Sequence, residues 1–148
     1  MSVLARSALD PRLAAVRETM PPRPPRGWIR AVREALRMTQ EDLGRRLEVT
    51  KQAIRHIETS EAEDSIRLGT LRRAAEALDS TLVYAFVPNS SLEETVERRA
   101  RTVAERDVSR TRQTMLLEDQ LGGAGDANRL VDELAEAAKN SRGLWRDS

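Results

Sequence analysis

Residues 38–58, MTQEDLGRRLEVTKQAIRHIE, decide the fold of this chain. Thr39 followed by Asp42 is a capping box that begins one helix, and Thr50 is a capping residue that begins the next. The inward positions of these two helices follow helical spacing: Leu43, Leu47, Ala53, Ile54 and Ile57. Two short helices joined by a tight turn and braced by helices on both sides predict a helix-turn-helix unit.

The second of these helices carries hydrogen-bonding side chains that a core does not need. They lie on or near the face that the apolar residues leave free: Thr50, Lys51, Gln52, Arg55 and His56. In a helix-turn-helix unit this helix enters the DNA major groove. Arginine matches guanine and glutamine matches adenine, whereas lysine and threonine suit phosphates. The spacing therefore predicts a DNA interface, and we expect further contacts from Thr39, Gln40, Arg30 and Arg26.

Two other interpretations of this face stay open. A helix-turn-helix pattern can serve as a protein-binding module that makes no DNA contact. His56, the only histidine, can contact a base or phosphate or simply be solvated, and it has no partner for a catalytic triad or metal cluster. We therefore expect no enzymatic activity, no metal site and no cofactor.

Composition and charge fit a protein that binds a polyanion. Residues 1–60 carry twelve Lys/Arg against seven Asp/Glu, a net charge of +5, and residues 61–148 carry thirteen against seventeen, a net charge of −4. The chain has no cysteine, and none of its apolar runs approaches the ~18 residues needed to span a bilayer. We expect a cytoplasmic, nucleoid-associated protein.

The chain divides into three predicted regions. Residues 1–27 combine a helix over 2–19, for which Asp10-Pro11 is a start signal, with a proline-rich basic linker. Residues 28–80 form the helix-turn-helix domain, with four to five helices. Residues 81–148 combine one strand with a helical region for dimerisation or partner binding. The predicted fold class is mainly α.

Residues 81–87, TLVYAFV, form the one convincing strand of the sequence, and Pro88 ends it. A single strand needs a partner for its backbone groups. Residues 65–68 of the same chain could pair with it, or helices could cover it as an edge strand. We favour pairing with the same strand of a second copy, which predicts a homodimer with Leu82, Tyr84 and Phe86 at its interface.

The C-terminal region is predicted to be two helices and a tail. Ser91 and Glu94 form a capping box that opens a helix of roughly 30 residues with one apolar stripe. The glycine cluster at 122–126 ends this helix, and a last helix follows over 127–140. Trp145 in the tail is expected to pack back on the chain or to dock on a partner.

Residues 28–79 resemble the helix-turn-helix domain of the phage-repressor-like, xenobiotic-response-element regulators. The resemblance rests on MTQEDL at 38–43, on Leu47, Val49, Gln52, Ile54, Ile57 and Glu58, and on LRRAAEAL at 71–78. Glu48 departs from the family pattern, since it stands where a glycine is usual in the turn. Arg67 departs as well, since it replaces a small polar cap.

Longer stretches are similar to the family called mobile mystery protein A. They are RPPRGWIRAVREALRMTQEDL, TLRRAAEALDSTLVYAFVP and TMLLEDQ, with Leu144-Trp145 in the tail. The resemblance implies a bacterial protein of mobile or plasmid contexts, encoded beside a Fic-domain protein. It further implies a toxin–antitoxin-like module in which this chain represses its own operon, as a dimer on a palindromic operator.

An alternative function is direct inhibition of the Fic-domain partner. Residues 114–119, TMLLED, are close to the Ser/Thr-xxx-Glu-Gly/Asn helix motif that restrains Fic enzymes, with Asp119 at the last position. Under this hypothesis Thr114, Glu118 and Trp145 in the tail contact the partner. The competing interpretation is that Met115 and Leu116 simply pack the long helix.

Overall fold

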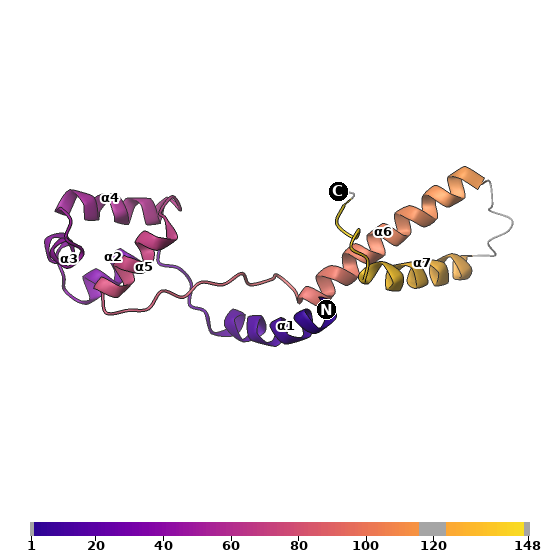
Figure 1. Cartoon of the computed structure of the whole chain (residues 1–148), viewed down its shortest axis with the longest axis horizontal. Coiled ribbons are helices and arrows are strands. Elements are labelled where there is room, and N and C mark those ends of the chain that lie inside the picture. Colours follow the sequence, from indigo (N-terminus) through magenta and orange to yellow (C-terminus); the bar gives the residue numbers. More distant parts are fainter. Residues whose placement is uncertain (1, 116–123, 147–148) are drawn as a thin grey trace. The chain divides into compact units, whose positions relative to one another are not determined.

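A computed structural model of the chain describes residues 2–115 and 124–146, and these residues are mainly helical (Figure 1). The prediction of a mainly α protein is confirmed. Seven helices lie in the described residues: α1 (Ser2–Thr19), α2 (Trp28–Ala35), α3 (Gln40–Leu47), α4 (Lys51–Ala62), α5 (Leu68–Ala77), α6 (Leu92–Met115) and α7 (Ala124–Lys139).

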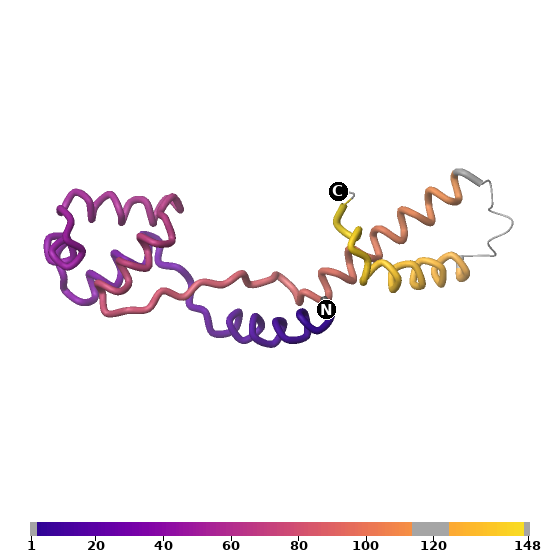
Figure 2. The backbone as a smooth tube through the Cα atoms, viewed as in Figure 1, coloured from indigo at the N-terminus to yellow at the C-terminus, as the bar shows by residue number. Residues whose placement is uncertain are grey.

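The helices belong to two compact units. Unit 2 is the continuous segment Met20–Ala85 and holds α2 to α5. Unit 1 is assembled from both sides of that segment, because it joins Met1–Thr19 to Phe86–Ser148. The chain therefore leaves unit 1 after α1, builds the whole of unit 2, and then returns to complete unit 1, as the backbone trace in Figure 2 shows.

Unit 2 is held together by a small apolar core. Its buried members come from all four helices or their ends: Ile29, Leu43, Ile54, Ala74 and Leu78. Leu43 and Ile54 are fully buried, so α3 and α4 pack their apolar faces against each other and against α5. Burying an aliphatic side chain of this size stabilises the fold by roughly 1.5–3 kcal/mol. The predicted inward residues of the helix-turn-helix thus form the centre of this unit.

Unit 1 is built on the packing of α6 against α7. Ala104 and Val108 on α6 are buried against Val131 on α7, and the small alanine allows the two helices to approach closely. At the surface Lys139 donates to Glu136 at 3.0 Å and to Glu97 at 3.1 Å, and these contacts raise the pKa of the lysine ammonium. One ion pair therefore joins the end of α7 to α6.

The N-terminal helix packs on the start of α6 through Asp10. The Asp10 carboxylate accepts the backbone N–H groups of Leu92 at 2.7 Å and Glu93 at 3.2 Å, so it caps the N-terminus of α6. Arg6, which is buried, donates to the Glu93 carboxylate at 2.6 Å. The prediction that Asp10-Pro11 starts a helix was wrong, because α1 runs from Ser2 through Pro11 and Asp10 caps a different helix.

The described residues contain no strand, so the predicted strand at 81–87 was wrong as an element of the single chain. The segment is extended, but no hydrogen bond joins its backbone to another described residue. Residues 65–68 do not pair with it, because Ser65 and Ile66 instead donate to the Ser60 carbonyl at the end of α4. A strand needs a hydrogen-bonded neighbour, and the described residues supply none to the segment.

The structure also tests the predicted bounds of the proline-rich segment, the last helix and the long helix. The proline-rich segment 20–27 is non-helical, as expected. The last helix begins at Ala124 rather than at 127, so the end of the glycine cluster is helical. The predicted long helix is observed as α6 up to Met115, and its expected continuation lies outside the described residues.

The cap that Asp10 provides can be tested by substitution. Asp10→Ala should destabilise the first turn of α6 by about 1–2 kcal/mol, because two backbone donors lose their acceptor. Asp10→Asn keeps one of the two acceptor oxygens and should lose less stability than Asp10→Ala. Native-state hydrogen exchange at Leu92 and Glu93 would measure the change, expected as roughly 5- to 30-fold faster exchange for the alanine variant. Unchanged protection in Asp10→Ala would show that the cap contributes nothing.

Candidate nucleic-acid interface

The turn between α3 and α4 is shaped by two local features. Glu48 caps α3 in the left-handed region, with φ of 57°. Gly44 lies against the turn so closely that a Cβ atom there would be 2.7 Å from the Val49 carbonyl oxygen. Glu48 therefore occupies a conformation that a glycine would adopt more easily. Gly44 leaves the space that lets the turn fold back on α3.

Both helices of the motif have a threonine cap. The Thr39 hydroxyl accepts from the Asp42 N–H at 3.1 Å, and the Asp42 carboxylate accepts from the Thr39 backbone N–H at 2.8 Å. Hydrogen bonds from the Thr39 hydroxyl and backbone hold the pKa of the Asp42 carboxyl below its usual range. At α4, the Thr50 hydroxyl accepts from the Ala53 N–H at 3.1 Å. Thr39 and Thr50, both candidate DNA contacts, are thus engaged in capping.

The first two turns of α4 expose a polar face. Lys51, Gln52, Arg55 and His56 are all exposed, whereas Ile54 on the opposite side is fully buried. The side chains of Gln52, Arg55 and His56 have no hydrogen bond or ion pair with any described residue. The hydrogen-bonding groups of this face are therefore available to a ligand outside the chain.

Lys51 and Arg30 have weak internal partners. The Lys51 ammonium lies 3.9 Å from the Glu41 carboxylate, and both side chains are more than half exposed. Arg30 pairs with Glu34 at 2.8 Å one turn along α2. Exposed pairs of this kind are worth only ~0.2–1 kcal/mol, so a phosphate can displace them. Arg26, in the proline-rich segment, is exposed.

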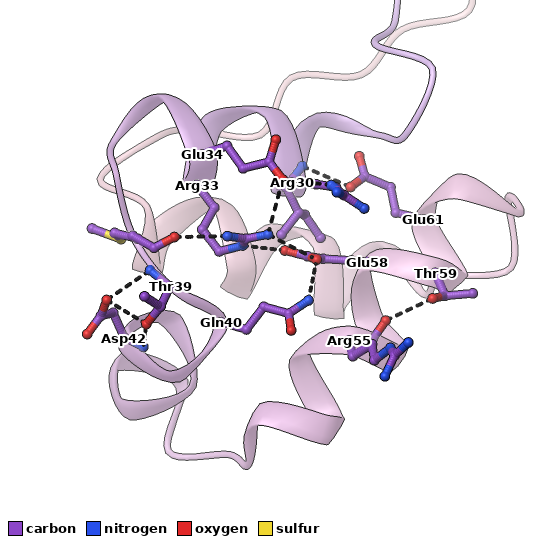
Figure 3. Close-up of polar contacts among 12 residues, drawn as sticks. Arg30, Arg33, Glu34, Thr39, Gln40, Asp42, Arg55, Glu58, Thr59 and Glu61 are labelled. Atoms are coloured by element: carbon purple, nitrogen blue, oxygen red, sulfur yellow. Dashed lines mark hydrogen bonds and ion pairs between the residues drawn. The ribbon is translucent and has the colours of Figure 1, made fainter.

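A buried ion pair locks α2, α3 and α4 together behind this face. The Arg33 guanidinium donates to the Glu58 carboxylate at 2.5 and 3.3 Å and to the Met38 carbonyl at 2.8 Å (Figure 3). Gln40 donates its side-chain amide to the same carboxylate at 2.9 Å. Arg33 and Glu58 are only 7% and 5% exposed. The pair therefore fixes the position of α4 relative to the two helices before it.

A second buried carboxylate fixes the far end of α4. Glu61 accepts the backbone N–H groups of Trp28 at 2.7 Å and Ile29 at 2.9 Å, and so caps the N-terminus of α2. Gly27 lies directly against this carboxylate, where a Cβ atom would be 2.6 Å from its oxygen. Arg23 donates to the Glu61 carbonyl and pairs with Asp64, which ties the proline-rich segment to the end of α4.

Sequence reasoning missed some features of this region. Thr59 is exposed one turn beyond Arg55, and its hydroxyl donates to the Arg55 carbonyl at 2.9 Å. Its spacing of four residues from Arg55 was the signal that could have placed it on the same face. The Arg33–Glu58 pair was also missed, since only its burial distinguishes it from surface charges.

The remaining candidate residues lie outside this face. Leu82, Tyr84 and Phe86 belong to the extended segment, where Tyr84 is 60% and Phe86 91% exposed. Trp145 is in unit 1, with the Arg99 guanidinium 5.7 Å from its ring centre, so it packs back in part while remaining 56% exposed. Thr114 is in the last turn of α6, and Glu118 lies outside the described residues.

Comparison with known protein families gives a match over part of the chain. A family model described as helix-turn-helix, HTH_3, matches residues 29–84. The chain carries a helix-turn-helix domain. This domain is of the phage-repressor type, and it makes the chain a DNA-binding transcription regulator. Neither curated proteins nor solved structures give a match. Among the helices that the structure describes, none has the length and apolar character needed to cross a membrane.

The buried ion pair generates a stability prediction. Glu58→Ala should destabilise unit 2 by about 3–5 kcal/mol, because it leaves the Arg33 guanidinium buried without its carboxylate. Replacing both residues, Arg33→Met with Glu58→Leu, should recover much of this loss, since no buried charge remains. Urea unfolding followed by Trp28 fluorescence in a Trp145→Phe background would measure both variants.

The control for this experiment is Arg30→Ala, which breaks an exposed pair and should change stability by less than about 1 kcal/mol. If Glu58→Ala unfolds at the same urea concentration as the Arg30→Ala control, the buried pair does not hold the helices together.

Proposed function

We propose that this chain is a sequence-specific transcriptional repressor that binds a palindromic operator of its own operon as a dimer. The observation that carries the proposal is the polar face of α4. Its free hydrogen-bonding side chains stand opposite a fully buried Ile54, on a helix whose position is fixed by Glu58 and Glu61. A rigid helix with an unpaired polar face is suited to reading base edges in a groove.

Each side chain of this face has a definite chemical role in the proposal. Arg55 presents the planar donor pair that matches guanine, and Gln52 presents the donor and acceptor that match adenine. Lys51 and His56 supply contacts to phosphates or bases near the start of the helix. Thr59 extends the same face by one turn.

Residues around α4 would add backbone contacts. One N–H of the Gln40 amide is held by Glu58, so the second N–H remains to bind a phosphate at the start of α3. Arg26 and Arg30 would add phosphate contacts beside α2. Thr39 and Thr50 would act mainly by capping, because their hydroxyls already bind backbone groups.

The regulatory setting rests on resemblance. The similarity to mobile mystery protein A supports a bacterial two-gene operon in which this chain acts as an antitoxin-like autoregulator beside a Fic-domain protein. Such a regulator would work in the cytoplasm, associated with the nucleoid. Its two copies would place their α4 helices about 34 Å apart, one turn of DNA.

The second candidate function is direct inhibition of the Fic-domain partner through unit 1. It is favoured by the motif at 114–119, whose glutamate would pair with a partner arginine, as charge-assisted hydrogen bonds allow. Trp145 remains half exposed in this unit and is available to a partner.

A titration on DNA tests the proposed repressor. Fluorescence anisotropy would compare the duplex immediately upstream of the gene with a scrambled duplex, at two salt concentrations. The expected result is tighter binding to the upstream duplex and a steep loss of affinity with salt, because phosphate contacts release counterions. Equal, weak binding to both duplexes would contradict sequence-specific repression at this site.

The same titration separates base contacts from phosphate contacts. Arg55→Ala should cost about 1–3 kcal/mol on the upstream duplex and reduce its advantage over the scrambled one. Lys51→Ala should weaken binding to both duplexes alike and lower the salt dependence. Arg101→Ala, on α6 in unit 1, serves as the control. Equal losses on both duplexes for Arg55→Ala would exclude a base contact by Arg55.

Direct inhibition has its own test. Glu118→Gly should abolish neutralisation of the co-expressed Fic-domain partner if this glutamate blocks the partner's active site, while DNA binding stays unchanged. Cell growth on induction of the partner is the readout, and Glu133→Gly on α7 is the matched control. Full neutralisation by Glu118→Gly would exclude inhibition through that residue.

A further inference from the structure

Unit 2 has an apolar cavity of about 400 Å³ on the side formed by α2, α5 and the segment that follows α5. Ile29 and Val32 line it from α2, Leu71 and Leu78 from α5 and its end, and Leu82 and Val83 from the extended segment. The wall is partly open to solvent, since Trp28 is 43% and Val83 71% exposed. An open apolar cavity of this kind can be closed by an apolar cover from another chain.

The segment at the rim of the cavity has unused hydrogen-bonding capacity. The backbone N–H and C=O groups of residues 81–85 form no hydrogen bond with any other described residue. Tyr84, beside the cavity-lining Val83, projects 60% of its surface to solvent. A row of free backbone groups beside apolar side chains is a template for another extended, apolar chain.

The charge of this surface allows two identical copies to meet. Arg23 is the one charged side chain among the residues that line the cavity. It is already neutralised within its own unit, because it pairs with Asp64 and donates to the Glu61 carbonyl. Two copies can therefore bring these surfaces together without placing unpaired like charges against each other.

We propose that the cover is residues 81–85 of a second copy, which run antiparallel to the same residues across a two-fold axis. Each segment then supplies the apolar side chains that close the cavity of the other copy and the backbone groups that its partner lacks. The surface is self-complementary, because it holds both the cavity and the segment that fills it. This inference rests on the proposed function, which includes a dimer. The interface itself would form without DNA.

The proposed interface leaves the polar face of α4 free. No residue of α4 lines the cavity, and the candidate base contacts Gln52 and Arg55 lie on the exposed face of that helix. A dimer joined through residues 81–85 can therefore present two α4 helices to DNA at once.

A cysteine scan tests the antiparallel geometry directly, because the chain has no cysteine of its own. Single cysteines are placed at each position from 81 to 86 of the full chain, with Glu63→Cys on the surface of unit 2 as control. Two cysteines form a disulfide only when their Cα atoms lie within about 7 Å. A residue on the two-fold axis meets this limit. A residue one position off the axis is displaced from its own copy by ~7 Å along the strands and by ~5 Å across them. Its two Cα atoms are therefore too far apart for a disulfide.

The expected result is one position with a sharp maximum of covalent dimer on mild oxidation, and little dimer at the positions on either side and at Glu63→Cys. Equal cross-linking along the segment, or none above the control, would overturn the proposal.

A substitution at an exposed position supplies the second measurement. Val83→Glu should weaken dimerisation by at least about tenfold, because an unpaired carboxylate would be buried in the apolar cavity. Val83→Thr keeps the branched shape and should weaken it less. Sedimentation equilibrium without DNA measures both variants, and circular dichroism checks that their helix content is unchanged. Val83→Glu with the dissociation constant of the native chain would also overturn the proposal.

These outcomes are separable from those of the repressor hypothesis. A dimer that cross-links at one position but shows no preference for upstream DNA keeps the interface and rejects the repressor. A chain that prefers upstream DNA but shows no cross-linking maximum along residues 81–86 keeps the repressor and rejects this interface.

Discussion

The position of α4, the helix proposed to contact DNA, depends on one buried ion pair, between Arg33 and Glu58. The pair fixes where α4 lies because both charges are buried, not because it adds much to the free energy of folding. A buried pair adds little stability over an apolar one, but any displacement of α4 would leave a charge unpaired in the core. Gln40 and the Met38 carbonyl complete the network, so the three helices that surround the turn have a single favourable arrangement.

Both units use a carboxylate from one helix to cap another helix. Glu61 near the end of α4 caps α2, and Asp10 in the middle of α1 caps α6. A cap taken from a distant residue does more than satisfy the first backbone donors of a helix. It also fixes where that helix begins in relation to the helix that supplies the carboxylate, because the hydrogen bonds tolerate only a narrow range of distances. Tertiary structure thereby sets secondary-structure boundaries here.

Local patterns predicted the parts of this protein that depend on local physics. The capping box at Thr39 and Asp42, the cap at Thr50 and the inward residues Leu43 and Ile54 all follow from spacing within a few residues. The Arg33–Glu58 pair joins residues 25 positions apart, and nothing in the spacing of two charged residues indicates that both are buried. The prediction that Asp10 starts its own helix was wrong for the same reason, since the backbone groups that it caps lie 82 and 83 residues away. The segment 81–87 has the composition of a strand, yet a strand also requires a neighbour, which composition cannot reveal.

The insertion of unit 2 between the two parts of unit 1 sets an order of events during synthesis. Residues 20–85 are contiguous, so the helix-turn-helix can fold as soon as its last helix has been made. The α1 helix is made first but must wait for α6, whose last described residue, Met115, is synthesised roughly 2–6 s after residue 85 at bacterial-like elongation rates. During this interval the buried side of α1 has no partner, while the DNA-binding unit is already complete. A nascent chain can therefore complete the core of unit 2 before it has the residues that it needs to assemble unit 1.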